Sequence, residues 1–285
     1  MPTIGMRAKF PVLAAALALL LAACGGDGAG GEGGTGVNPG IPGGPGTPGN
    51  PLPPLTGAWS GTYEIGTVQG APDEGDTSLL VLDNGEYWLF YGDALPGGFA
   101  VHGFVQGSGV STNGEFASTN ARDFFGILPV LAGTLEANYT TQAVLGAASF
   151  PQWTTAFSGT PVPASTYDFE APASLDDIVG LWPMQLLDGT PVDVTIQPDG
   201  SLGGEDSSNF GGPRCSFIGA AAPRLDGTNV FDIQLEFGPA PCTLPNQVVS
   251  GVGFTHTIAG TAVRQFLVGA VDGIRSQGTA LFGVR

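Results

Sequence analysis

Cys24 is the residue whose type and position point most clearly to chemistry. Two cations near the N-terminus precede an apolar run over residues 10–21, and two alanines then lead directly into the cysteine. Small side chains allow a signal peptidase to cut beside them, and a cysteine at the new N-terminus supplies a sulfur nucleophile for a diacylglyceryl group. The apolar run has about a dozen residues against the roughly twenty of a membrane-spanning helix, so it predicts a removable signal. An ordinary secretory signal, with Cys24 present by chance, is the alternative.

The four residues Leu-Ala-Ala-Cys at 21–24 resemble the lipobox of bacterial lipoproteins. The resemblance implies a signal peptide over 1–23 and an acyl anchor, such as palmitate, on Cys24. The next residue is Gly25 rather than an aspartate. By resemblance to the enterobacterial sorting rule, we expect a protein anchored by lipid in the outer membrane, with no cofactor.

The sequence contains two further cysteines, Cys215 and Cys242. Because the signal predicts export to an oxidising compartment, the pair predicts a disulfide bond. A metal site is the alternative, although the sequence places no histidine or third cysteine at ligand spacing nearby.

Motifs for catalysis are missing from the sequence. It contains no Gly-x-Ser-x-Gly elbow, Walker loop or dinucleotide fingerprint, and its two histidines, His102 and His256, stand alone. Paired acids occur at 176–177 and 205–206, and a third group, Asp73, Glu74 and Asp76, leaves a loop calcium site open as an alternative to solvated turn residues. We therefore expect no enzymatic activity and no bound metal.

An aromatic stretch over residues 86–91 is the least ordinary part of the chain. Alternation along a strand places Trp88 and Phe90 on one face and Tyr87 and Tyr91 on the other, so that neither face is polar. A strand that is apolar on both faces is covered on both sides. The stretch predicts an interface with the other half of the chain or with a loop holding the phenylalanines at 124–125; a binding platform for a ligand or partner is the alternative.

The charge of the chain is strongly negative. Acids number 25 against eight bases, and the net charge is −17. Nucleic-acid binding needs clustered lysines and arginines, so this balance excludes it, and it also disfavours electrostatic docking on anionic lipids. A basic protein partner remains compatible with the charge.

A Gly/Pro-rich stalk follows the lipobox. Of the 32 residues from 25 to 56, 13 are glycine and 7 are proline, so little apolar surface is available to offset the entropy of ordering. Prolines at every third position from Pro39 to Pro51 indicate a semi-rigid polyproline spacer, with a short collagen-like helix as the alternative. We expect residues 24–54 to be a disordered, lipid-anchored linker.

Two repeats make up the rest of the chain. Gly57 and Trp59 open the first, and Gly180 and Trp182 open the second 123 residues later. Each repeat contains about eight short alternating segments separated by Gly- and Pro-rich turns, which predicts an all-β fold of two tandem, up-and-down antiparallel barrels. A pair of β-sandwiches is the alternative. The predicted domains are a first barrel at 55–160, a linker at 161–173 and a second barrel at 174–285, which begins with a short capped helical turn at 174–177.

The Gly-x-Trp openings resemble those of calycin-like barrels. That resemblance implies that a terminal arginine, Arg285 or Arg275, covers Trp182. The second repeat also resembles a domain of Gram-negative lipoproteins of generally unassigned function, through the residues Asp199-Gly200, Cys215-Ser216-Phe217 with Gly219, Asn229-Val230-Phe231 and Cys242.

These features together predict a non-catalytic binding or interaction protein of the cell envelope. Its partners would be the membrane, through the acyl anchor, and a protein or small molecule. The alternatives are an inhibitor of a basic envelope enzyme such as a lysozyme, a hydrolase with an unrecognised site, and a purely structural envelope component. Because small barrels are filled by their own side chains, binding is expected on loops or outer faces.

Overall fold

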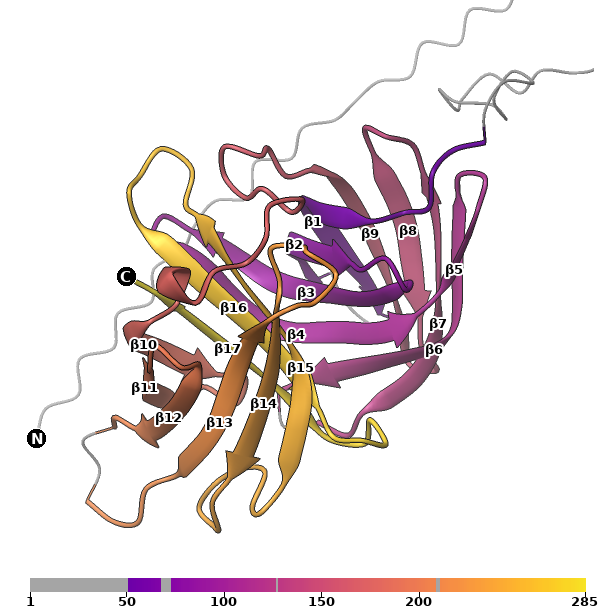
Figure 1. Cartoon of the computed structure of the whole chain (residues 1–285). Helices are drawn as coiled ribbons and strands as arrows, with labels where there is room; N and C mark the ends of the chain where they lie inside the picture. The colour runs from indigo at the N-terminus through magenta and orange to yellow at the C-terminus, as the bar shows by residue number, and fades with distance from the viewer. Residues whose placement is uncertain (1–50, 68–72, 127, 209–210) are drawn as a thin grey trace, which may run out of the picture. The chain divides into compact units, whose positions relative to one another are not determined.

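A computed structural model describes residues 51–67, 73–126, 128–208 and 211–285 (Figure 1). The predicted signal peptide, Cys24 and nearly all of the predicted stalk lie outside these residues. Within them the protein is almost entirely β-structure, and the two tandem closed barrels predicted from the sequence are confirmed. The β-sandwich alternative is wrong.

The first barrel contains eight antiparallel strands in sequential order, closed by the pairing of β1 with β9 and of β4 with β6. A short strand, β5, continues beyond β4 and pairs only with β6. The strands are β1 (Gly57–Thr67), β2 (Asp73–Val81), β3 (Glu86–Leu95), β4 (Gly98–Ser108), β5 (Val110–Thr112), β6 (Glu115–Phe125), β7 (Leu131–Tyr139), β8 (Val144–Ser149) and β9 (Trp153–Pro161).

The second barrel contains eight strands, each paired with its neighbours in the chain, and the pairing of β10 with β17 closes it. A single turn of 3-10 helix, η1 (Leu175–Asp177), precedes it. The strands are β10 (Gly180–Leu186), β11 (Pro191–Ile196), β12 (Ser201–Asp206), β13 (Ser216–Pro223), β14 (Phe231–Phe237), β15 (Val248–Thr257), β16 (Arg264–Val271) and β17 (Gly278–Val284).

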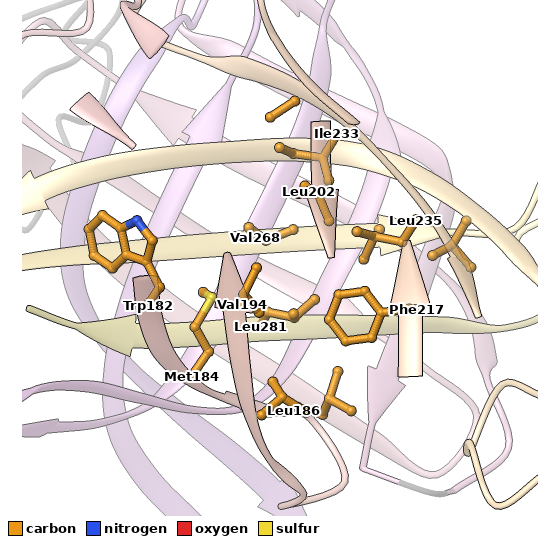
Figure 2. Packing of buried hydrophobic residues seen from close by; sticks show 14 of the residues in the cluster. Trp182, Met184, Leu186, Val194, Leu202, Phe217, Ile233, Leu235, Val268 and Leu281 are labelled. Atoms are coloured by element: carbon orange, nitrogen blue, oxygen red, sulfur yellow. The ribbon is translucent and has the colours of Figure 1, made fainter. Parts of the chain in front are cut away.

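The interior of the second barrel is filled with its own side chains. Along β14, Phe231, Ile233, Leu235 and Phe237 are buried, and the residues between them are exposed. Figure 2 shows Trp182, Met184, Leu186 and their neighbours pointing into this space from strands on all sides. The cavity that remains measures about 10 Å³, which is at the lower limit for a single water molecule. The inside of this barrel therefore has no room for a ligand.

The Gly-x-Trp openings have a conformational reason. Gly57 and Gly180 adopt φ values of +103° and +115°, a region that disfavours side chains. The indole of Trp182 donates to the Ile178 carbonyl at 2.7 Å, and the guanidinium of Arg285 lies 4.0 Å above its ring. Arg285, rather than Arg275, is thus the arginine that covers Trp182. Trp59 donates to the Thr56 carbonyl at 3.3 Å, and the described residues place no cation over it.

Cys215 and Cys242 are joined by a disulfide bond, as predicted. It ties the start of β13 to the segment between β14 and β15, across 27 residues of chain. Replacing both cysteines with alanine is expected to lower the free energy of unfolding by about 3–4 kcal/mol, because the unfolded chain loses a closed loop. Urea denaturation of the variant and of the parent protein, with and without reductant, measures this. An unchanged midpoint after reduction would contradict the expectation.

The two barrels share a third apolar cluster, which we name the junction core. The first barrel contributes outward-facing side chains of β3, β4 and β6, the second contributes those of β15, β16 and β17, and the segment joining the barrels adds two more rings. Its members include Trp88, Phe90, Phe104, Phe124, Tyr167, Phe169, Val252, Phe254, Leu267 and Ala280. This packing explains why β3 and β16 are buried on both faces.

Gly269 on β16 allows the barrels to approach closely. A β-carbon placed there would lie 2.7 Å from Trp88 and 2.9 Å from Phe90. Such distances are far below van der Waals contact, so a larger residue would push the two rings away from the strand.

The predicted linker, 161–173, is attached to both barrels. Val162 donates its amide to Ala58 of β1 at 2.9 Å, and Thr166 accepts from the amide of Thr257 on β15 at 3.0 Å. Tyr167 donates its hydroxyl to the Asn229 carbonyl at 2.5 Å, and its ring is buried. The segment therefore fastens the barrels together and is not a free spacer.

Candidate functional site: a groove between the barrels

The aromatic stretch on β3 lies at the interface between the barrels. Tyr87 and Tyr91 point into the first barrel, whereas Trp88 and Phe90 point out into the junction core, and each of the four is at most 1% exposed. The interface prediction is confirmed. The alternative of a ligand platform is wrong, because side chains at this level of burial have no surface to offer a ligand.

Other sequence expectations need correction. The phenylalanines at 124–125 belong to strand β6, which runs to Phe125, and not to a loop. Ser174 precedes η1 but its side chain caps nothing, so the predicted turn is present without its predicted side-chain cap.

The acidic groups do not form a metal site in the described residues. The Asp73–Asp76 group lies on strand β2 rather than in a loop, and one carboxylate oxygen of Asp76 accepts the Ala94 amide at 2.9 Å. Asp177 pairs with Arg264 at 2.9 Å. Within the described ranges, no three His, Cys, Asp or Glu side chains converge as ligands.

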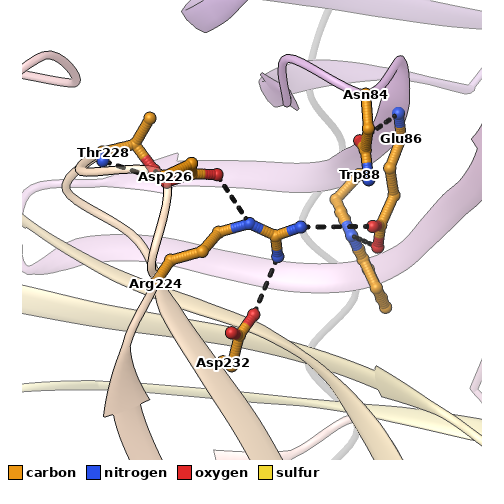
Figure 3. Close-up of polar contacts among 7 residues, drawn as sticks. All are labelled: Asn84, Glu86, Trp88, Arg224, Asp226, Thr228 and Asp232. Atoms are coloured by element: carbon orange, nitrogen blue, oxygen red, sulfur yellow. Dashed lines mark hydrogen bonds and ion pairs between the residues drawn. The ribbon is translucent and has the colours of Figure 1, made fainter.

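A polar network, centred on Arg224, links the second barrel to the first (Figure 3). Arg224 donates to Asp226 and to Asp232 at 2.8 Å each, and a third nitrogen lies 3.9 Å from Glu86 at the start of β3. Glu86 in turn accepts from the indole of Trp88 at 2.9 Å. Because the guanidinium of Arg224 is shared among carboxylates of both barrels, the network stabilises the junction.

Two side chains of the second barrel also form hydrogen bonds to the backbone of the first. The side-chain amide of Gln265 on β16 accepts from the Phe99 amide at 2.7 Å and donates to the Phe99 carbonyl at 2.6 Å. Arg275 donates to the carbonyls of Gln106 and Asn120 at 2.6 Å each. These bonds join side chains of the second barrel to backbone groups of the first.

A groove of about 540 Å³ lies where the barrels meet, beside the junction core. Its walls come from β1 and β2, from the β3–β4 turn, from the joining segment and from β15 and β16. Most lining groups are apolar, among them Leu95, Phe99, Phe254 and Leu267, while hydroxyls of Ser60, Ser78, Thr166 and Thr257 line it too. This volume falls within the usual range of about 300–1,000 Å³ for small-molecule sites.

His256 is the unusual member of this lining. It lies on β15 opposite Gln265, on the outward face that also carries Phe254. Its imidazole makes no hydrogen bond to any residue that the structure describes. Burial lowers the pKa of His256 to about 4, so the ring is neutral near pH 7 and presents one donor and one acceptor. His102, by contrast, lies on β4 with its side chain exposed and 3.4 Å from Asp93.

A second polar cluster lies inside the first barrel. The carboxylate of Asp123 on β6 accepts from the hydroxyl of Tyr91 at 2.7 Å and from the indole of Trp153 at 3.1 Å. Burial raises the pKa of Asp123 from 3.8 to about 6, while the two hydrogen bonds oppose the shift. Sequence reasoning missed this residue because the phenylalanines that follow it, at 124–125, were expected in a loop; a strand continued to Phe125 places Asp123 inside the barrel.

The raised pKa of Asp123 predicts a pH-dependent stability. Since the folded-state pKa lies above the unfolded value, its contribution is complete below pH 3.8 and is lost as the pH rises through about 6. The loss amounts to about 3 kcal/mol for a shift of roughly two units. Asp123→Asn has no carboxylate at this position to titrate, so it should not show this loss. Between pH 4 and pH 7 the free energy of unfolding of the parent protein should therefore fall by that amount relative to the variant. Urea denaturation at both pH values measures it, and His256 titrates in both proteins and cancels. Parallel pH profiles would contradict the assignment.

Comparisons with known proteins give no family. No family model matches the chain, and no curated protein matches it. One solved structure, a protein of unknown function from the DUF3598 family of Nostoc punctiforme PCC 73102, aligns over 80% of this chain and 94% of its own at 11% identity and a TM-score of 0.26. In the described part of the chain, no helix has the length and hydrophobicity to cross a membrane.

Proposed function

We propose that this protein is a non-catalytic binding protein of the cell envelope, anchored by lipid at Cys24, and that it holds a small molecule in the groove between its barrels. The observation that carries the proposal is the groove itself, with apolar walls around a single unpaired imidazole. Sites for small molecules combine these features: a mostly apolar concavity and a few polar groups that fix orientation.

The lipid anchor is supported by the sequence around Cys24. Signal, small residues and cysteine stand in the order that acylation requires, and the Gly/Pro-rich stretch that follows would hold the barrels away from the bilayer. An outer-membrane location is the corresponding proposal. With this arrangement, the groove would be open to molecules of the periplasm or the cell exterior.

An inhibitor of a basic envelope enzyme is the second candidate. A trough of about 630 Å³ on the outside of the first barrel is lined by Glu64, Glu74 and Asp76, and the whole chain carries −17. Such a surface would attract a cationic protein, with an affinity that falls steeply as salt is added. If hen lysozyme binds at low salt and binds with the same affinity at 0.5 M salt, this electrostatic mechanism is ruled out.

The small-molecule proposal is tested by filling the groove. Ala94 lines the groove from an exposed position on β3, so Ala94→Trp should block the space with little effect on folding. We expect the full-length protein, held in a nonionic amphipathic polymer, to enhance the fluorescence of the uncharged probe N-phenyl-1-naphthylamine. Ala94→Trp should abolish the saturable part of this signal.

The matched control is Ala132→Trp, which adds the same side chain at an exposed position of β7 away from the groove. It should bind the probe as the parent protein does. Equal probe binding by the parent protein and Ala94→Trp would overturn the proposal.

A further inference from the structure

The residues that line the groove indicate which class of ligand it binds. This inference rests on the function proposed above. Three features of its lining bear on the question: the position of the apolar side chains, the state of His256 and the charges present.

The apolar part of the lining forms one continuous wall. Leu95 and Phe99 of the first barrel and Ile258 after β15 line it with accessible surface, whereas Phe254 and Leu267, which also line it, are buried in the junction core. A hydrocarbon placed against this wall would exchange contact with water for contact with apolar side chains. The wall therefore favours a ligand with an apolar body.

Apart from the carboxylate of Asp76, the polar groups of the lining are uncharged and incompletely paired. His256 has no hydrogen-bond partner among the described residues, and the hydroxyl groups of Thr166 and Thr257 line the same groove. A neutral imidazole can donate to one group and accept from another, which matches a hydroxyl or an amide. A ligand that left this imidazole unpaired in a closed site would bind less tightly.

The charges of the lining disfavour anionic ligands. No lysine or arginine lines the groove, and Arg264, the nearest cation on β16, is already bonded to Asp177 and to Thr255. The carboxylate of Asp76 accepts the Ala94 amide. A carboxylate or phosphate head would be buried without a counter-charge, and the chain's own negative charge would repel it.

We propose that the groove binds an uncharged amphipathic molecule, with its apolar body on Leu95, Phe99 and Ile258 and a hydroxyl or amide head at His256. The ligand is bound without a covalent bond to the protein. The ligand class follows from an apolar wall that ends at a neutral, unpaired hydrogen-bonding group.

Photoaffinity labelling of the full-length protein in membranes tests this proposal. Three probes share one ten-carbon body bearing a diazirine and differ in the head, which is an alcohol, a carboxylate or a primary amine. After irradiation at pH 7, peptide mass spectrometry measures modification of the lining residues of β1 and β15. We expect the alcohol to reach half-maximal labelling at a concentration about tenfold below that of the carboxylate, since a buried unpaired charge costs at least that factor, and below that of the amine, whose hydration would be lost against the apolar wall.

Two matched variants separate the role of His256 from the shape of the groove. His256→Phe keeps an aromatic ring but removes the nitrogens that would bond to the hydroxyl head of the ligand. The concentration of the alcohol at half-maximal labelling should therefore rise about fivefold. His102→Phe makes the same change on the exposed face of β4 and should leave labelling unchanged.

The outcomes distinguish this inference from the proposed function. Groove labelling that Ala94→Trp abolishes, but with the carboxylate or amine equal to or better than the alcohol, would overturn the ligand class and leave the binding function standing. Undiminished alcohol labelling of His256→Phe would overturn the role of His256. If no probe labelled the groove, both the inference and the small-molecule function would be wrong.

Discussion

Replacing Trp88 with alanine is expected to lower the free energy of unfolding by about 3–5 kcal/mol, the usual cost of emptying the site of a large buried aromatic residue. The Trp88 ring is 1% exposed, stacks on Phe104 with ring centres 5.7 Å apart, and lies against Gly269 of the other barrel. Its loss would open a cavity between the barrels. Urea denaturation, followed by circular dichroism, measures the change.

A control for this substitution exists on β8. Leu145 is 60% exposed, so Leu145→Ala removes a large apolar side chain from the same barrel without touching the junction core. It should change the stability by less than about 0.5 kcal/mol. The distinguishing result lies in the second barrel, where Trp88→Ala should speed the hydrogen exchange of β15 and β16. If exchange there stayed as in the parent protein, the junction core would not couple the barrels.

Replacing Cys24 with serine is expected to abolish lipid attachment completely. A serine hydroxyl cannot replace the thiolate that takes up the diacylglyceryl group, because its proton is held far more tightly. Cells grown with labelled palmitate should therefore incorporate the label into the parent protein and not into Cys24→Ser. Gly36→Ser, which adds the same side chain within the stalk, should retain the full label. Equal labelling of parent and Cys24→Ser would refute the anchor.

Much of the fold was predictable because most strands are buried on one face only. In β14 the alternation of Phe231, Ile233, Leu235 and Phe237 with charged and polar residues fixes both the strand and its inward face. The residues Asp83-Asn84-Gly85 likewise predict the β2–β3 hairpin, and Gly85 has the positive φ of 80° that such a turn requires. Alternation and turn residues are therefore enough to predict a strand and its inward face where the other face is exposed to solvent.

The pairing of the barrels was predictable only in part. The aromatic run at 86–91 indicated that both faces of β3 are covered, but nothing in its pattern identified β15 and β16 as the cover. In β16, the run from Phe266 to Val271 predicts burial on both faces without naming the partner. The sequence predicts only a linker at 161–173 because its prolines and alanines carry no strand pattern, and this pattern does not indicate that Tyr167 and Phe169 within it are buried.

The groove was not predictable from the sequence. Ser60 and Thr62 on β1 and His256 on β15 lie almost two hundred positions apart in the chain and meet only because the barrels pack together. A histidine in a strand carries no sign of whether it will face solvent, as His102 does, or a buried wall, as His256 does. Burial depends on the packing of the second barrel on the first, which is a property of the whole fold.

The groove exists only while the barrels remain joined, so the account depends most on their forming one cooperative unit. Pulsed hydrogen exchange of the full-length protein at increasing urea concentrations, read by peptide mass spectrometry, tests this directly. The account predicts that peptides of β1–β9 and of β10–β17 lose protection together, at a single urea midpoint. Loss of protection in the first barrel while the second stays protected at higher urea, or the reverse, would contradict it.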